Sequence, residues 1–162
     1  MMQILYTKCG TPFEVDDDVA DQVMGLAWYI NRHGYVTRKT TINGKKGRSV
    51  LLHRFVMECT NKDDLVDHID CNKLRNTKSN LRFASSSQNS MNGIKKIGTS
   101  SIFKGVTWNK QVKKWQVTIK ARSKSFYIGL FDDEHEAGHE YNKAAIALHG
   151  DFARINPIGY SA

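Results

Sequence analysis

The stretch Val66–Asn89, V-D-H-I-D-C-N-K-L-R-N-T-K-S-N-L-R-F-A-S-S-S-Q-N, decides how the rest of the chain is interpreted. Asp67 and His68 stand side by side near its start. Asn80 lies in its middle and Asn89 closes it. A neutral imidazole can accept a proton near neutral pH, and oxygen ligands hold hard divalent cations. The stretch therefore predicts phosphodiester hydrolysis, although an Asp-His pair by itself is more often structural.

The charge around this stretch is strongly one-sided. The 162-residue chain has a formal net charge of +8, and between Cys71 and Phe131 it contains no Asp or Glu. A field of one sign attracts a polyanion and releases its counterions. Interleaved aromatic residues favour a folded nucleic-acid surface over a basic surface kept only for solubility. The thirteen basic residues in this range are Lys73, Arg75, Lys78, Arg82, Lys95, Lys96, Lys104, Lys110, Lys113, Lys114, Lys120, Arg122 and Lys124.

Cysteine usage and hydropathy argue against several classes of protein. Cys9, Cys59 and Cys71 are odd in number and widely spaced, which disfavours a disulfide framework and a structural zinc site. A half-buried thiol is the favoured reading of Cys71, with a ligand role as the alternative. No run approaches the roughly eighteen apolar residues of a membrane span, and the N-terminus lacks a signal-peptide pattern. We expect a cytoplasmic protein without a membrane partner.

Residues 2–58 are expected to form a mixed α/β unit. Asn43-Gly44 is the strongest hairpin signal, because both turn positions need positive φ. Arg54 is a candidate phosphate contact and His53 a candidate support for the site, while a surface Arg and a packed His remain the alternative. Period-two alternation predicts strands over 3–7, 13–16, 35–41 and 49–52, and helical spacing predicts helices over 19–26 and 53–59.

Residues 90–101 are polar and basic and contain Gly93 and Gly98, which predicts a linker. Lys95 and Lys96 are candidate phosphate contacts there, although a plain spacer would have a similar composition. Just before this segment, residues 85–87 are serines that can cap a helix. Asn89 would then lie in the first turns of that helix.

The last third of the chain predicts a three-stranded antiparallel sheet covered on one face by a helix. Strands are expected over 104–108, 115–120 and 125–131, and a helix over Glu134–Leu148 that is capped by Asp132 or Asp133. The uncovered face would carry Gln116, Thr118, Lys120 and Tyr127. Such a polar, basic face can lie in a DNA groove.

Two resemblances sharpen these expectations. V-D-H-I-D-C-N…N-L-R-F…S-S-Q-N resembles the HNH nuclease motif of phage and intron homing endonucleases, and the preceding L-L-H-R-F-V-M resembles the segment that leads into it. The match covers residues 35–92 and implies a ββα-metal fold around one divalent ion. It implies that His68 is the general base and that Asn80 orients it. Asp67 and Asn89 would hold the metal, for which oxygen donors favour Mg²⁺ (or Mn²⁺). Cys71 stands where the family usually has Gly.

Residues 102–157, F-K-G-V-T-W…K-W-Q-V-T-I-K…F-Y-I-G-L-F-D-D-E-H-E-A…A-A-I-A-L-H-G-D-F, resemble the AP2 DNA-binding domain. That family lays its sheet in the major groove. Several AP2 arginines are absent here, so no base preference follows from the resemblance. The matching positions imply that Thr107, Asn109, Thr118, Lys120 and Tyr127 face DNA, and Lys110, Lys113, Lys114 and Lys124 are better candidates for phosphate contacts.

The resulting prediction is an α+β protein that cleaves double-stranded DNA as a homing-type endonuclease. Residues 1–92 would form the HNH nuclease domain with its N-terminal extension, with the ββα-metal core at about 64–92. Residues 93–101 would be a basic linker and residues 102–162 an AP2-like domain. We expect a monomer, encoded by a phage and acting in the bacterial cytoplasm. The alternatives are a DNA-binding regulator with an inactive HNH module and a structure-specific or RNA-directed nuclease.

Overall fold

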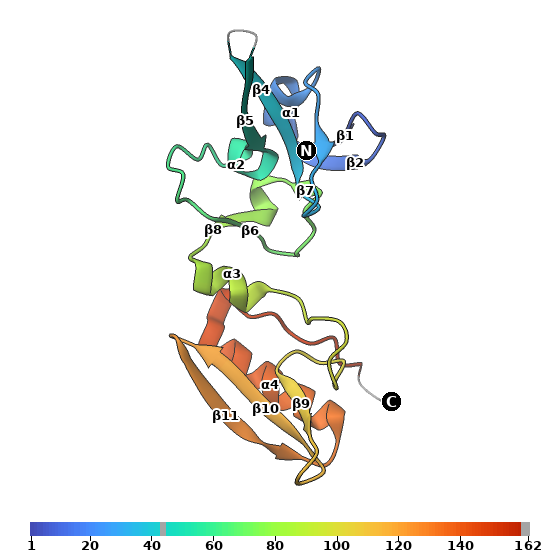
Figure 1. Cartoon of the computed structure of the whole chain (residues 1–162), viewed down its shortest axis with the longest axis vertical. Coiled ribbons are helices and arrows are strands. Elements are labelled where there is room, and N and C mark those ends of the chain that lie inside the picture. The colour runs from blue at the N-terminus through green and yellow to red at the C-terminus, as the bar shows by residue number, and fades with distance from the viewer. Residues whose placement is uncertain (43–44, 160–162) are drawn as a thin grey trace. The chain divides into compact units, whose positions relative to one another are not determined.

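A computed structural model describes residues 1–42 and 45–159 (Figure 1). The chain is a mixed α+β protein that divides into two compact units, residues 1–84 and 85–162. The expected module ends at residues 92 and 102 stay a prediction, and the expected Asn43-Gly44 turn lies outside the described residues. Within the described ranges, no helix has both the length and the apolar character needed to cross a bilayer.

The first unit contains three small sheets, ordered β1-β2-β7, β3-β4-β5 and β6-β8. Its apolar core includes Phe13, Trp28, Val36, Leu52 and Leu81. In chain order the elements are β1 (Met2–Tyr6), β2 (Pro12–Asp16), α1 (Asp17–Val23), β3 (Tyr29–Ile30), β4 (Val36–Ile42), β5 (Lys45–Leu51), α2 (Leu52–Val56), β6 (Val66–His68), β7 (Arg75–Asn76), the short 3₁₀ helix η1 (Lys78–Asn80) and β8 (Leu81–Phe83).

The helix α1 begins and ends earlier than the predicted range 19–26. Asp17 and Asp18 lie in its first turn, where carboxylates are favoured by the helix dipole. The helix ends at Val23, two residues before Gly25, which has φ +78°. Val19 and Val23 face the core as expected, together with Ala20, whereas Leu26, expected on the same face, lies beyond the helix and is 36% exposed.

β7 was not predicted from the sequence. It pairs in parallel with β2, so that Arg75 lies opposite Glu14 and Asn76 opposite Val15. Arg75 Nε also lies 2.7 Å from Glu14 Oε2. A two-residue strand has no periodicity to detect, and this partner is about sixty residues away. The N-terminal strands therefore support the loop between β6 and β8.

The second unit confirms the predicted antiparallel three-stranded sheet with one helix. Its strands are ordered β11-β10-β9, and α4 packs on β10 and β11. Asp133 caps α4 by accepting from Glu136 N at 2.8 Å, and Gly150 ends it with φ +54°. The elements are α3 (Ser86–Asn92), β9 (Val106–Asn109), β10 (Lys114–Ala121), β11 (Lys124–Phe131), α4 (Glu134–His149) and the short 3₁₀ helix η2 (Gly150–Phe152).

The second core fixes which face of this sheet stays open. Val117 and Ile119 of β10 are buried with Tyr141 of α4. Gly105 (φ +77°) packs against that tyrosine so closely that an added Cβ would lie 2.0 Å from the ring. No other residue fits at position 105 without movement of the ring or the backbone.

Candidate active site and nucleic-acid interface

Asp67 and His68 lie on β6, which pairs antiparallel with β8 in a two-stranded sheet. Asp67 is opposite Arg82 and His68 is opposite Leu81. The two residues are 5% and 4% exposed. Neighbouring residues of a strand project to opposite sides. Asp67 and His68 therefore project from β6 in opposite directions, and each side chain is buried.

Asn80 holds the loop between these two strands. Its Oδ1 accepts from Asp70 N at 3.1 Å, and its Nδ2 donates to Arg75 O at 3.0 Å. Cys71 N donates to His68 O at 2.9 Å inside the same loop, and Cys71 has φ +66°. The position that usually carries Gly in the resembling family is thus left-handed, and the cysteine occupies it at a conformational cost of about 1 kcal/mol.

The neighbouring Asn76 determines which nitrogen of His68 can act as a base. Asn76 Nδ2 donates to Lys73 O at 3.3 Å, so its Oδ1 is the atom that lies 3.2 Å from His68 Nε2. An amide oxygen only accepts, so Nε2 must carry the proton. In the neutral ring the basic lone pair is then on Nδ1.

Two aromatic rings pack against this imidazole. The ring centroid of His53, in α2, lies 5.2 Å from that of His68, and the Tyr35 centroid lies 6.0 Å from it. Tyr35 and His53 also contact each other at 5.1 Å. Burial lowers the pKa of His68, against the opposing effects of Asn76 and the nearby carboxylates. The ring packing therefore favours the neutral form that a general base requires.

His53 is more strongly affected than His68. Burial lowers the pKa of His53 to about 3, and the charges of His68 and Arg54 act in the same direction. Its Nδ1 is buried without a hydrogen-bond partner among the described residues. His53 is therefore a neutral packing partner of the candidate base. The expected support role fits this contact, and the alternative of a packed histidine fits its burial.

We expect His53 to make the fold acid-sensitive. The unfolded chain protonates this histidine below about pH 6.5, whereas the folded chain resists protonation until about pH 3, so stability falls as the pH falls. At about pH 4.5 the loss from this group is about 2–3 kcal/mol. Urea unfolding at neutral and acidic pH should show a smaller acid-induced loss for His53→Phe than for the wild type. His139→Phe, at an exposed position, should keep the wild-type loss; equal losses in all three proteins would contradict the assignment.

Asp67 is tied to Arg82. Its Oδ2 accepts from Arg82 Nε at 3.0 Å and from Nη2 at 2.9 Å. The side chains are 6% and 17% exposed, so this ion pair is largely removed from water. The pairing fixes the orientation of the carboxylate on β6.

The donor chemistry of the proposed ligands suits a hard cation. Asp67 offers a carboxylate and Asn89, on α3 in the second unit, offers an amide oxygen. Mg²⁺ commonly uses one or two protein ligands and completes its shell with water and substrate phosphate. In the described part of the chain, no three His, Cys, Asp or Glu side chains form a metal-binding group. The proposed ligands are Asp67 and Asn89, and an asparagine is not among those four residue types. The proposed pair would therefore not form such a group.

Two of the basic candidates, Arg54 and Lys95, have defined local contacts, and a third, Lys96, is exposed. The guanidinium of Arg54 donates to Asp64 O and to Asn61 O, which holds the loop before β6. Lys95 Nζ donates to Val106 O at 3.3 Å, and burial lowers its pKa. Of these three side chains, that of Lys96 is the most accessible to a phosphate.

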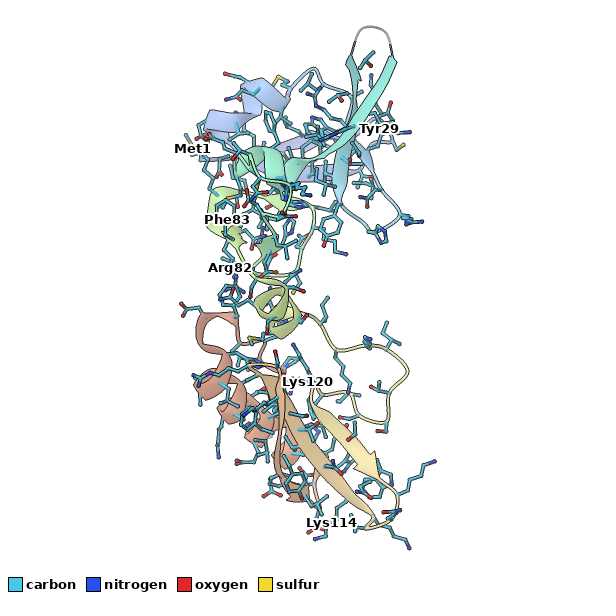
Figure 2. The ribbon with its side chains drawn as sticks, turned by 60° about the vertical axis from the view of Figure 1, so that its left-hand side comes forward. Met1, Tyr29, Arg82, Phe83, Lys114 and Lys120 are labelled. Carbon is cyan, nitrogen blue, oxygen red and sulfur yellow. The ribbon has the colours of Figure 1, made fainter. Side chains whose placement is uncertain are left out.

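The open face of the second sheet gathers most of the other candidates. Strand register pairs Gln116 with Thr107 and Lys114 with Asn109, and the bulge after Val117 pairs Thr118 with Tyr127. Figure 2 marks Lys114 and Lys120 near the two ends of β10. Lys110, Lys113, Lys120, Lys124 and Tyr127 are exposed, whereas Lys114 lies 3.0 Å from Asp132 and Asn109 donates to Gln116.

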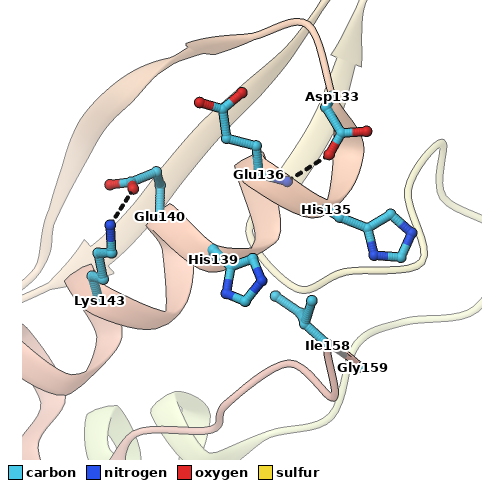
Figure 3. A pocket seen from close by; sticks show the side chains of 8 residues that line it. All are labelled: Asp133, His135, Glu136, His139, Glu140, Lys143, Ile158 and Gly159. Atoms are coloured by element: carbon cyan, nitrogen blue, oxygen red, sulfur yellow. Dashed lines mark hydrogen bonds and ion pairs between the residues drawn. The ribbon is translucent and has the colours of Figure 1, made fainter. Parts of the chain in front are cut away.

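A hollow on α4 contains none of these candidates. It is lined in part by His135, His139 and Ile158, and Figure 3 shows the two histidine side chains near Ile158. Asp133 is engaged as the helix cap, and Glu140 lies 2.6 Å from Lys143. α4 packs on the core face of the sheet, so this hollow is separate from the open face.

Asn76 and Tyr35 were not identified from the sequence as part of the site. Asn76 is fully buried within a polar run, and Tyr35 lies at the end of a turn more than thirty residues before His68. The buried asparagine would have been recognisable only if β7 had been predicted as a strand.

Comparison with known proteins gives three informative relatives. The chain is 34% identical over 134 residues to an uncharacterized HNH endonuclease of Acanthamoeba polyphaga mimivirus. The matched region covers 82% of this chain and 68% of that protein. It is 33% identical over 90 residues to Protein 3.8 of Escherichia phage T7, covering 56% and 74%. A 57-residue region is 39% identical to APETALA2-like protein 2 of Oryza sativa subsp. japonica, covering 35% and 13%. No family model and no solved structure matches the chain.

Proposed function

Because the chain belongs to the HNH endonuclease family, we propose that it is a metal-dependent, homing-type endonuclease that hydrolyses phosphodiester bonds of double-stranded DNA. The observation that carries this proposal is the buried Asp67-His68 pair, with Asn76 setting the tautomer of His68. The β6–β8 hairpin followed by α3 is the proposed ββα-metal element.

His68 is the proposed general base. With Nε2 protonated toward Asn76, Nδ1 takes the proton of the attacking water. His53 and Tyr35 pack on the ring and limit its rotation. Asn80 fixes the loop that leaves His68, and through that loop it positions the base.

Asp67 and Asn89 are the proposed ligands of Mg²⁺ or Mn²⁺. A bound hard cation neutralises charge on the leaving oxygen and polarises the phosphate. Arg82 holds the Asp67 carboxylate in place. No structural zinc is part of the proposal.

The AP2-like region is proposed to bind duplex DNA through the open face of its sheet. Donors and acceptors on this face suit base edges, and the lysines suit phosphates. Additional phosphate contacts are proposed for Arg54, Lys95 and Lys96. Arg54 would use the guanidinium N–H groups that are not bonded to Asp64 O or Asn61 O. The face positions are Thr107, Asn109, Thr118, Lys120 and Tyr127, and the proposed phosphate contacts beside them are Lys110, Lys113, Lys114 and Lys124.

Incubation of the full-length protein with supercoiled plasmid tests the activity. We expect relaxation by nicking in Mg²⁺ or Mn²⁺ and none in EDTA, since one active centre cuts one strand. Tight binding without cleavage in either metal would instead indicate a DNA-binding regulator. Faster cleavage of branched DNA or of RNA than of plain duplex would favour a structure-specific or RNA-directed nuclease.

A further inference from the structure

A second acid-free segment lies in the first unit, outside the AP2-like region. Between Asp21 and Glu58 the chain has no Asp or Glu. Most of this segment's basic residues lie on or beside the β4–β5 pair. The Lys and Arg residues of the segment are Arg32, Arg38, Lys39, Lys45, Lys46, Arg48 and Arg54.

The pair β4–β5 is a two-stranded ribbon over most of its length. β3 pairs only with Val36 and Thr37, so no described strand borders β4 beyond that point. Figure 1 shows the two strands running outward from α2. Seven residues of strand span about 23 Å, and a two-stranded ribbon fits the width of the DNA major groove.

One face of this ribbon is polar and open. Lys39 lies opposite Ser49, and Thr37 Oγ1 lies 2.7 Å from Ser49 Oγ on the same face. On the other face, Arg38 packs over the buried Trp28, with its guanidinium carbon 5.7 Å from the ring centroid. The side chains of Lys39 and Arg48 are exposed, and neither has a hydrogen bond or ion pair among the described residues. Arg38 thus fixes one face of the ribbon to the core, while Lys39 and Arg48 remain accessible to a polyanion.

The strands also pack unusually closely where the register shifts. Thr40 lies opposite Gly47, where an added Cβ would be 2.4 Å from Thr40 Oγ1, and Thr40 Oγ1 donates to Arg48 O at 3.0 Å. This close contact fixes the spacing of β4 and β5 at the register shift.

Both strands of the ribbon connect, at the same end, to residues that pack on the candidate base. Tyr35 precedes β4 directly, and His53 lies in α2, which follows β5. Their rings pack on each other and on His68. A DNA groove bound by the ribbon would therefore lie at a fixed distance from the imidazole of His68.

We propose that the β4–β5 ribbon is a second DNA-binding element, which lies in the major groove with Lys39 and Arg48 on the bordering phosphates and fixes the cut site relative to the bound groove. This inference rests on the proposed function, because it assumes that duplex DNA is the substrate. It assigns a role to the N-terminal unit that is separate from the AP2-like sheet.

Binding of the full-length protein to a labelled duplex of mixed sequence, in EDTA and over a range of salt, tests the ribbon. We expect the Lys39→Ala/Arg48→Ala double variant to lose about tenfold or more in affinity at moderate salt. The slope of log affinity against log salt should fall by about 2, one unit for each lost phosphate contact. Lys8→Ala/Lys62→Ala removes the same charge from other exposed positions and should change the slope by less than half as much.

Small molecules that occupy one DNA groove test whether the ribbon binds in the major groove. Methyl green, which occupies the major groove, should abolish the difference between the wild type and the ribbon variant, whereas distamycin in the minor groove should preserve it. Equal losses in both double variants, or a difference that persists in methyl green, would overturn the ribbon assignment alone. Failure of the wild type to bind any duplex would overturn the proposed function as well. Thermal unfolding checks that the variants remain folded, as expected for exposed side chains.

Discussion

His68→Ala is expected to lower the rate of metal-dependent plasmid cleavage by about 10²–10⁴-fold, the usual contribution of a positioned general base. The imidazole is the only proposed proton acceptor, and Asn76 holds it with the basic lone pair on Nδ1. Affinity for duplex DNA should change little, because the proposed phosphate contacts are elsewhere. Single-turnover cleavage and binding in EDTA measure the two quantities separately.

His139→Ala provides the matched control, since His139 is exposed in the second unit. It should cleave at the wild-type rate. Added imidazole should partly restore cleavage by His68→Ala, which a purely structural role would not allow. Retention of more than about a tenth of wild-type activity by His68→Ala would remove this residue from the base role.

Asp67→Ala is expected to cause two separate losses, one of metal-dependent cleavage and one of stability. The carboxylate is a proposed metal ligand, and it also neutralises the mostly buried Arg82. Removal of one partner of a buried ion pair costs about 3 kcal/mol or more, because the other charge is left unpaired. Urea unfolding and cleavage over a series of Mg²⁺ concentrations measure the two effects.

The double variant Asp67→Ala/Arg82→Leu separates these roles. Removal of both charges should recover most of the lost stability, because no buried charge remains unpaired. Cleavage should stay abolished, since the proposed ligand is still missing. If the stable double variant regains cleavage, Asp67 acts only as the partner of Arg82 and the ligand assignment is wrong.

Local patterns in the sequence predicted the second unit well. Period-two alternation placed Val117 and Ile119 in the core, and Asp133 and Gly150 mark the ends of α4. The bulge after Val117 was not predictable, because a single extra residue leaves no periodic signal. In the loop after His68, the position where the similar family usually has Gly is occupied by Cys71, and its φ is +66°.

The surroundings of His68 were harder to predict, because they come from distant parts of the chain. His53 was a recognisable candidate, whereas the contact of Tyr35 with the same ring depends on how β4 and α2 pack. Asn76 is brought to His68 by a parallel strand pair too short to show a pattern. Sequence reasoning found the residues with recognisable chemistry and missed those whose role depends on tertiary packing.

The parallel pairing of β2 with β7 has a consequence for how the β6–β8 segment could be exchanged between genes. Glu14 N donates to Leu74 O at 2.8 Å, and Lys78 Nζ lies 2.6 Å from Asp18 Oδ2. The segment that carries Asn76 is thus held by β2 and α1, which lie much earlier in the chain. A recombination event that moved only the segment from β6 to β8 would separate β7 from β2, the strand with which it pairs. The smallest transferable unit that keeps Asn76 beside His68 therefore includes β2.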